Sequence, residues 1–349
     1  MTTRTRYFVI ASLLVLTVGV GTGLVAYYVG LPDGVALQAQ GEDLRLLPQN
    51  SHLVAHANVR RVMDSDLRQR LRTLIPMSGQ GQRELLEQTG INIDTDIEEV
   101  LTSIAPLQQT ASSTNETPQM GPLALARGRF DVTRLENLMQ EKGAQAETYK
   151  NVKLLLAPRH TDNNNPSRSP DDFAVAFIEP DLAAIGSATL IRSAVDQRAS
   201  GAGVTGNAAL MDLIRSLNNS DLWAVGDFAA LTGGGRLPSE IAGQLPGITQ
   251  FAAAADVDSG VRGSVRADAR DQASADDLRQ VVQGLLALGR LQLRSRPELK
   301  SFLDSLVLGG SGNTVSLTFD IPPQLIDLLG SVVASGGRTG TQDSTPQPR

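Results

Sequence analysis

The sequence predicts an α+β protein in which an N-terminal transmembrane helix precedes two related halves with mainly antiparallel sheets. Three observations lead to this prediction: an uncharged run at residues 7–30, two short repeats in the same order in both halves, and alternating strand-like and helix-like stretches. With 41% hydrophobic residues, the 349-residue chain can bury cores of ordinary size.

The uncharged run at residues 7–30 predicts one membrane-spanning helix. At about 1.5 Å per residue it is long enough for a hydrocarbon core of about 30 Å. Arg4 and Arg6 precede the run, and the first charge after it is Asp33. The positive-inside rule therefore places residues 1–6 in the cytoplasm and the rest of the chain outside it.

Several sequence features bear on where the protein lies. Nearly all of the 31 basic residues are arginine, and Ala and Gly are abundant, which favours a GC-rich bacterial source. In a bacterium, the predicted span with its N-terminus inside indicates the cytoplasmic (inner) membrane. A cleaved signal peptide is the alternative, because residues 34–36 are small and follow Pro32. Gly19 and Gly23 form a GxxxG pair that would allow self-association of the membrane helix.

Repeats divide the remainder of the chain. Residues 50–62 (NSHLVAHANVRRV) match residues 219–231 (NSDLWAVGDFAAL), and 127–138 (RGRFDVTRLENL) resembles 266–281 (RADARDQASADDLRQV). Two matches in one order predict a duplication. The expected divisions are a juxtamembrane spacer at 31–47, a first half at 48–216, a second half at 217–334 and a disordered polar tail at 335–349.

Each half is expected to follow an approximate β-α-β-β-α-β order. Asp131 should cap a helix that ends before Gly143, and Ser274 with Asp277 forms an apparent capping box for another helix. Segments 108–121 and 159–171 are expected to be surface loops. The expected strands are 53–59, 99–107, 122–130, 152–157, 172–178, 182–186, 221–228, 248–257, 261–269, 305–308 and 314–321. The expected helices are 60–74, the one after Asp131, 188–198, 238–245, the one after Ser274, and one from Pro322 to about 333.

One face of these strands is a candidate binding surface. Side chains alternate along a strand, so His52 and His56 share a face, and Trp223 occupies that face in the repeat. The expected strands 122–130 and 261–269 each direct two arginines to one side, Arg127 with Arg129 and Arg262 with Arg266. If helices cover the other face, these residues form a groove for an acidic or polymeric ligand, with arginines as charge clamps and Trp223 as a stacking surface. The candidate face comprises His52, His56, Arg127, Arg129, Trp223, Arg262 and Arg266. The alternative is an ordinary solvated sheet face.

Composition and motifs exclude several kinds of site. The chain has no cysteine, and its net charge of −6 gives no attraction for nucleic acid. His52 and His56 lack a third ligand other than His160, so no metal site is predicted. Residues 201–206 fit GxGxxG, but a helix pattern precedes them instead of a strand. We therefore expect no cofactor and identify no catalytic residue.

The segments LPQNSHLVAHANV, GPLALARGRFDVTRLENLM and NSDLWAVGDF resemble a loose group of uncharacterised bacterial membrane-anchored or secreted proteins. The resemblance implies the anchored α+β arrangement and transfers no site. Together these features predict a non-enzymatic binding or scaffolding protein of the cell envelope that contacts an envelope protein or polymer. The alternatives are an envelope hydrolase with an unrecognised site, or a carrier of lipid or another small ligand.

Overall fold

The structure is a computed structural model that describes residues 39–74, 86–107, 119–157, 173–201, 203–217, 220–228, 247–292 and 297–326. The predicted membrane run 7–30, with Gly19 and Gly23, lies outside these residues, as does the tail 335–349. Among the described residues, no helix combines the length and apolar character needed to cross a membrane.

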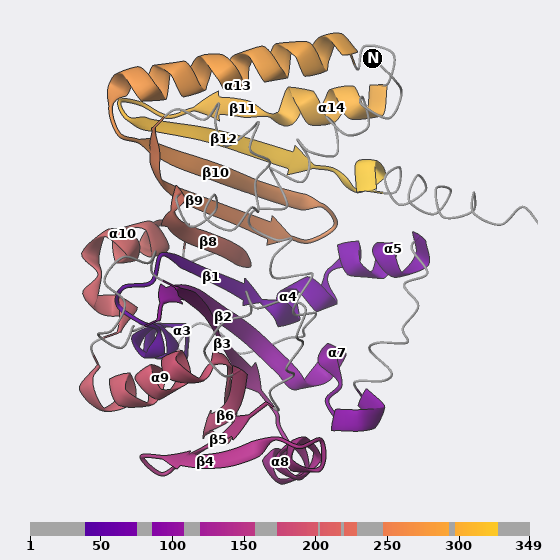
Figure 1. The fold of residues 1–349 in the computed structure, drawn as a ribbon. Coiled ribbons are helices and arrows are strands. Elements are labelled where there is room, and N and C mark those ends of the chain that lie inside the picture. The colour runs from indigo at the N-terminus through magenta and orange to yellow at the C-terminus, as the bar shows by residue number, and fades with distance from the viewer. Residues whose placement is uncertain are drawn as a thin grey trace, which may run out of the picture.

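The described chain is a mixed α+β structure built on one twelve-stranded antiparallel sheet (Figure 1). The strand order is β11-β12-β10-β9-β8-β1-β2-β3-β7-β6-β5-β4. The strands are β1 (Leu53–Asn58), β2 (Ile97–Pro106), β3 (Met120–Gly128), β4 (Gln145–Tyr149), β5 (Val152–Leu156), β6 (Phe173–Glu179), β7 (Leu182–Ser187), β8 (Leu222–Asp227), β9 (Ile248–Val257), β10 (Val261–Ala269), β11 (Val307–Gly309) and β12 (Thr314–Ile321). The prediction of mainly antiparallel pairing is confirmed, but the expected separate sheets are continuous with each other.

Helices lie on the sheet and at its ends (Figure 1). They include α3 (Ala39–Asp43), α4 (Val59–Asp64), α5 (Asp66–Leu74), α7 (Ile93–Asp96), α8 (Val132–Glu141), α9 (Ala188–Ser200), α10 (Ala208–Leu217), α13 (Gln272–Gln292) and α14 (Pro297–Ser305), with 3-10 turns η2 (Leu44–Leu46) and η3 (Val204–Gly206).

The first strand of each predicted repeat meets the other at the centre of the sheet. β1 and β8 are antiparallel, and Ala55 lies opposite Ala224, its match in the repeat. The ends of the ladder are also equivalent, because Asn58 N donates to Asp221 O at 2.7 Å and Asp227 N donates to His52 O at 2.8 Å. Outward from this pair, β2-β3-β7-β6 on one side correspond in order to β9-β10-β12-β11 on the other.

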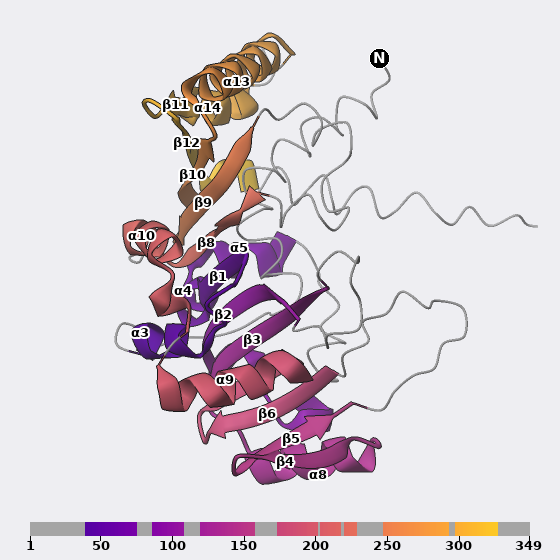
Figure 2. The ribbon, with the colours of Figure 1, turned by 60° about the vertical axis from the view of Figure 1, so that its left-hand side comes forward.

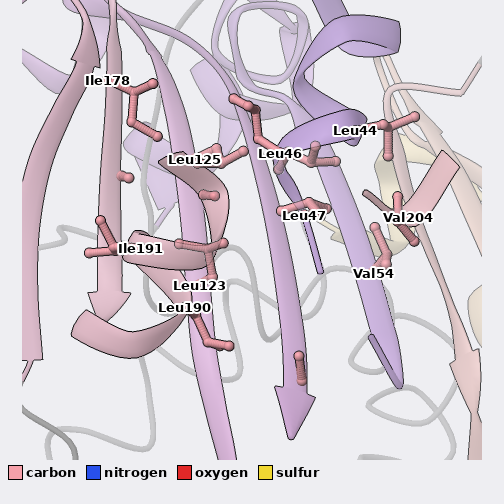
Figure 3. Packing of buried hydrophobic residues seen from close by; sticks show 14 of the residues in the cluster. Leu44, Leu46, Leu47, Val54, Leu123, Leu125, Ile178, Leu190, Ile191 and Val204 are labelled. Carbon is pink, nitrogen blue, oxygen red and sulfur yellow. The ribbon is translucent and has the colours of Figure 1, made fainter. Parts of the chain in front are cut away.

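Hydrophobic cores lie on both faces of the sheet. The first face carries Val54, Leu125 and Trp223, and it is covered by η2, α9 and α10 (Figure 3). In the close-up, Leu46 and Leu47 lie between Leu125 of β3 on one side and Val54 of β1 on the other. The second face carries Ala55 and Ala224 and packs against residues of α5, α13 and α14. The central strands are therefore buried on both sides, which explains their nearly continuous apolar sequences.

The segment before β1 belongs to the folded core. Leu44, Leu46 and Leu47 are buried in the first-face core, and Asp43 is buried beside them. Residues 43–47 are therefore not part of a polar spacer, contrary to the boundary predicted at Pro48. Their side chains are anchored against the sheet because three leucines in four positions can bury a large apolar area.

Two helix boundaries differ from the sequence prediction. The expected helix at 60–74 is interrupted at Ser65, whose backbone is extended (φ −64°, ψ 145°) and separates α4 from α5. α13 begins at Gln272 rather than after Ser274. Its cap is Asp271, which accepts a hydrogen bond from Ser274 N at 2.8 Å, as Asp131 accepts one from Arg134 N at 3.0 Å at the start of α8.

Some elements have no counterpart in the prediction. The strand β4, the helices α10 and α14, and the short helices α3 and α7 were not expected. The predicted helix at 238–245 lies outside the described residues. Of the last predicted helix, residues 323–326 are helical and the rest lie outside the described part. Within α13, Leu278 is buried, whereas Val281 and Leu285 are exposed.

The cap of α13 gives the fold a pH-dependent contribution. Hydrogen bonding from Ser274 N lowers the pKa of Asp271 below its ordinary 3.8. A lowered folded-state pKa stabilises the fold above the ordinary value, and that contribution is lost as the pH falls through the folded-state value. We expect the excess stability of the wild type over Asp271→Asn to be constant down to about pH 4 and to shrink below it. Urea unfolding at a series of pH values measures this difference.

Asp276→Asn is the matched control, because Asp276 lies near the start of the same helix with a side chain 52% exposed, against 50% for Asp271, and pairs with Arg279 at 2.5 Å. A difference between wild type and Asp271→Asn that does not change between pH 7 and pH 3 would contradict the cap assignment.

Candidate functional site

The predicted binding residues lie largely on one face of the sheet, but most of that face is covered. His56 alternates with Ala55 and so shares the first face with Val54, and Arg127 shares it with Leu125. On β10, Val261 and Val265 face the second core, which places Arg262 and Arg266 on the first face. The expectation that helices cover only the opposite face is wrong, since η2, α9 and α10 lie on this one.

His56 and Trp223 are enclosed at the centre of the first face. Their rings stack with centroids 5.5 Å apart and an interplanar angle of 25°. His56 Nε2 lies 3.2 Å from Glu99 Oε2, and the exposed fractions of His56, Trp223 and Glu99 are 3%, 0% and 3%. The predicted role of Trp223 as a stacking surface for a ligand is therefore wrong for this structure.

This enclosed group contains polar atoms with few partners. Within the described residues, His56 Nδ1, Glu99 Oε1 and Trp223 Nε1 have no hydrogen-bond partner. Each such buried atom costs about 1–3 kcal/mol of desolvation. Glu99 and His56 offset part of that cost, because each keeps the other as a partner.

Arg127 is held in an ion cluster whose central pair, Arg127 with Asp43, is buried. Its Nε and Nη2 donate to the two oxygens of Asp43 at 3.0 and 2.6 Å, and Nη1 donates to Asp181 at 2.7 Å and lies 3.6 Å from Glu179. Only 14% of the Arg127 side chain is exposed. A guanidinium that already binds a carboxylate in bidentate fashion has no free pair of donors for a ligand.

Burial and hydrogen bonding shift the pKa values of Asp43 and Arg127. Burial raises the pKa of Asp43 above its ordinary value, and the hydrogen bonds from Arg127 oppose that rise. The hydrogen bond to Asp43 in turn raises the pKa of Arg127. The raised pKa of Asp43 favours its neutral form, whereas the raised pKa of Arg127 favours its charged form, so the two shifts disagree about whether the pair is ionised. The bidentate geometry decides for an ionised pair at neutral pH, in which Arg127 offsets the desolvation of Asp43.

The cluster ties the segment before β1 to the sheet. Asp43 ends α3, and Arg127 lies on β3, 84 residues further along the chain. Sequence reasoning missed this role because the acid was assigned to a spacer. The leucines that follow Asp43 were the available signal that this segment enters the core.

His52 and Arg129 form smaller surface contacts. His52 Nδ1 lies 3.1 Å from Asp227 Oδ2, and both side chains are about two-fifths exposed. Arg129 follows β3, donates to Thr95 O and lies 3.4 Å from Asp96. Exposed pairs of this kind typically contribute about 0–1 kcal/mol, so both are surface polar groups joined to their neighbours.

The glycine-rich loop at 201–206 connects α9 to α10, as its helix context predicted. It contacts the segment before β1, because Val204 N donates to Leu47 O at 2.9 Å. Gly203 allows this approach, since a Cβ there would lie 1.9 Å from Arg45 O. The loop thus has a packing role.

Arg262 and Arg266 lie where the first face is open. They alternate with Ser264 on β10, and the neighbouring strand β12 adds Ser316, Thr318 and Asp320 to the same face. These six side chains are exposed or half-buried, and we call them the open polar face. Arg266 pairs with Asp268 at 3.0 Å.

A hollow of about 760 Å³ adjoins the open polar face at the β9–β10 turn. Asp221 is 4% exposed, accepts a hydrogen bond from Val257 N at 2.9 Å, and lies 3.0 Å from Arg61 Nη1. The charged residues that line the hollow are Arg61, Asp221, Asp256, Asp258, Arg262 and Asp320. Among the described residues, no group of three or more His, Asp or Glu side chains is placed to hold a metal ion, and His160 lies outside them.

The buried position of Arg127 predicts a large loss of stability on substitution. Arg127→Leu leaves Asp43 buried without its partner, which should lower the free energy of unfolding by about 3–5 kcal/mol. Arg129→Leu, two residues away and 67% exposed, should change it by less than about 1 kcal/mol. Urea unfolding measures both. Equal effects at the two positions would contradict the buried cluster, and adding Asp43→Leu to Arg127→Leu should restore part of the loss.

Trp223 is the only tryptophan and provides a direct test of enclosure. We expect its fluorescence in the folded protein to be blue-shifted and nearly insensitive to iodide, because its exposed fraction is 0%. Unfolding in urea should shift the emission to longer wavelengths and make it quenchable. Iodide quenching of the folded protein comparable to that of the unfolded protein would show that the ring is open to ligands after all.

Comparisons with known proteins add little to this geometry. No protein-family model matches the chain, and no curated protein matches it. Among solved structures, crystal form I of TP0453 is similar, with a TM-score of 0.42 and 8% sequence identity over 84% of this chain and 97% of that one. A likeness this weak carries no argument about fold or function.

Proposed function

We propose that the protein is a membrane-anchored, extracytoplasmic and non-enzymatic component of the cell envelope that binds or scaffolds a partner through the open polar face. The observation that supports this proposal is the uneven cover of the first face. Its centre is buried under η2, α9 and α10, whereas the side chains on β10 and β12 remain open to solvent.

The composition of the open polar face suits an extended polar ligand. Arg262 and Arg266 supply planar donors, Ser264, Ser316 and Thr318 supply hydroxyl groups, and Asp320 supplies an acceptor. Such a shallow array favours a peptide segment or glycan laid across the strands, with the guanidinium groups contacting its acidic or carbonyl oxygens.

The proposal includes two related halves on one sheet and the anchor at residues 7–30. The central pairing of Ala55 with its repeat match Ala224 and the equivalent strand orders support a duplication. The uncharged run and the preceding arginines support an inner-membrane position with the folded part outside the cytoplasm. A tether of this kind would confine the open polar face to the membrane-proximal envelope.

Crosslinking in the native membrane tests the binding role. Arg262→Glu and Arg266→Glu reverse charge on the open polar face, and we expect the double variant to lose most of the crosslinked partner because a close like charge opposes binding. The yield of each crosslinked species is measured by mass spectrometry against the wild type.

Arg215→Glu is the matched control, because Arg215 is also an exposed arginine but lies on α10 and pairs with Asp212 within its own helix. It should leave the crosslinked yield unchanged. Retention of every partner by the double variant at equal protein level would show that the open polar face is not the binding surface.

A further inference from the structure

The hollow at the β9–β10 turn is formed where four segments of the chain meet. Arg61 belongs to α4, Asp221 precedes β8, and the other lining residues come from the turn with its flanking strands and from the end of β12 (Figure 1). Gly260 brings the turn against β12, because a Cβ at this position would lie 2.4 Å from Ile321 O. The hollow is therefore built by closely packed backbone, and its volume of about 760 Å³ is typical of ligand pockets.

Negative charge predominates around this hollow. Its described lining contains four aspartates and two arginines. Asp256 and Asp320 lie opposite Arg262 on the two neighbouring strands, so these three residues form a row across the sheet. An excess of carboxylates in a concave surface attracts cations. Because the hollow is much larger than a single ion, the cation that suits it is a group on an organic molecule.

Asp221 supplies a buried acceptor that lacks a donor. Its side chain is only 4% exposed, and its Oδ2 accepts a hydrogen bond from Val257 N at 2.9 Å. Its Oδ1 has no hydrogen-bond partner among the described residues, because Arg61 Nη1 lies 3.0 Å away without forming a hydrogen bond. The Arg61 side chain is 65% exposed. A buried carboxylate oxygen without a donor is costly, and an ammonium group in the hollow would supply the missing hydrogen bond.

We propose that the hollow binds a primary ammonium group of a peptide, with Asp221 as its buried acceptor and Asp258 and Asp320 as its exposed ones. This inference rests on the proposed binding role of the open polar face, which shares Arg262 and Asp320 with the hollow. The helices α9 and α10 do not extend over β10 and β12 in either view, so a peptide can continue from the hollow onto that face (Figure 1 and Figure 2). A peptide is favoured over a neutral glycan, which has no cation to offer.

Retention of synthetic peptides by the full-length protein, measured by mass spectrometry, tests this inference. One library of random octapeptides without lysine or arginine has a free N-terminal amine, and a second is the same library after N-acetylation. The wild type should retain the free-amine library about tenfold better, because only its peptides can donate a charged hydrogen bond to the hollow. A third library, N-acetylated but with one lysine, identifies the source of the ammonium. Retention like that of the first library assigns it to side chains as well, and retention like that of the second assigns it to the N-terminus alone.

Asp221→Asn is the test variant, because its amide removes the charge and still offers an acceptor for the backbone hydrogen bond at the end of β9. It should bring the ratio of free to acetylated peptides close to one. Asp258→Asn combined with Asp320→Asn should also lower the ratio, and these exposed positions keep the test valid if the buried substitution prevents folding. The emission of Trp223 verifies folding. Asp212→Asn, on α10 with a side chain 75% exposed, is the matched control and should leave the ratio unchanged.

Three results would overturn this inference. Equal retention of free and acetylated peptides, lost in the Arg262→Glu, Arg266→Glu variant, would leave the open polar face as the binding surface without a role for the hollow. A preference for free amines that persists in Asp221→Asn and in the Asp258→Asn, Asp320→Asn variant would place the ammonium elsewhere on the protein. Retention of no peptide from any library would exclude a peptide ligand, whereas the crosslinking experiment decides separately whether the open polar face binds a partner.

Discussion

The antiparallel pairing of β1 with β8 is the contact on which the rest of the structure depends. It joins two sets of strands into one sheet, and its residues are buried on both faces. Two cores meet at this ladder: Val54 and Trp223 contribute to one, and Ala55 and Ala224 to the other. Loss of this pairing would expose apolar surface on both sides of the sheet at once, so the two sets of strands are expected to unfold together.

The first face shows how polar groups are enclosed within such a sheet. His56 has Glu99, and Arg127 has Asp43, so each charged or titratable group retains at least one partner where water is excluded. The Asp43 contact also closes the face, because it brings the leucines of η2 over β1 and β3 (Figure 3). The same side chains that suggested a ligand clamp in the sequence therefore hold the chain to itself.

Local patterns predicted the strands of the second half closely. The boundaries of β9, β10 and β12 agree with the sequence prediction, because apolar alternation and the Asp258-Ser259-Gly260 turn are local signals. β4 was missed because QAETY is a polar edge strand with little apolar alternation. The α+β class followed from the same local signals.

The layout of the two faces could not be predicted in the same way. β1 is apolar at both Val54 and Ala55, so its sequence does not indicate which side a helix covers. The contact of Asp43 with Arg127 spans 84 residues, and no local signal connects them. On β10 the polar and apolar residues alternate, and there Arg262 and Arg266 were placed on the correct, open side. The exposed face of a strand could thus be predicted from the sequence where one face is solvated, and could not where both are buried.

The central ladder also has a consequence for synthesis of the chain. β1 is made long before β8, and until β8 is available its outer edge has unpaired backbone groups on a strand of apolar residues. A ribosome adding about 5–20 residues per second needs many seconds to cover that interval. The nascent chain must therefore pass through a state in which its most buried strand is an open sheet edge, and that state is the one in which a chaperone would have most to protect.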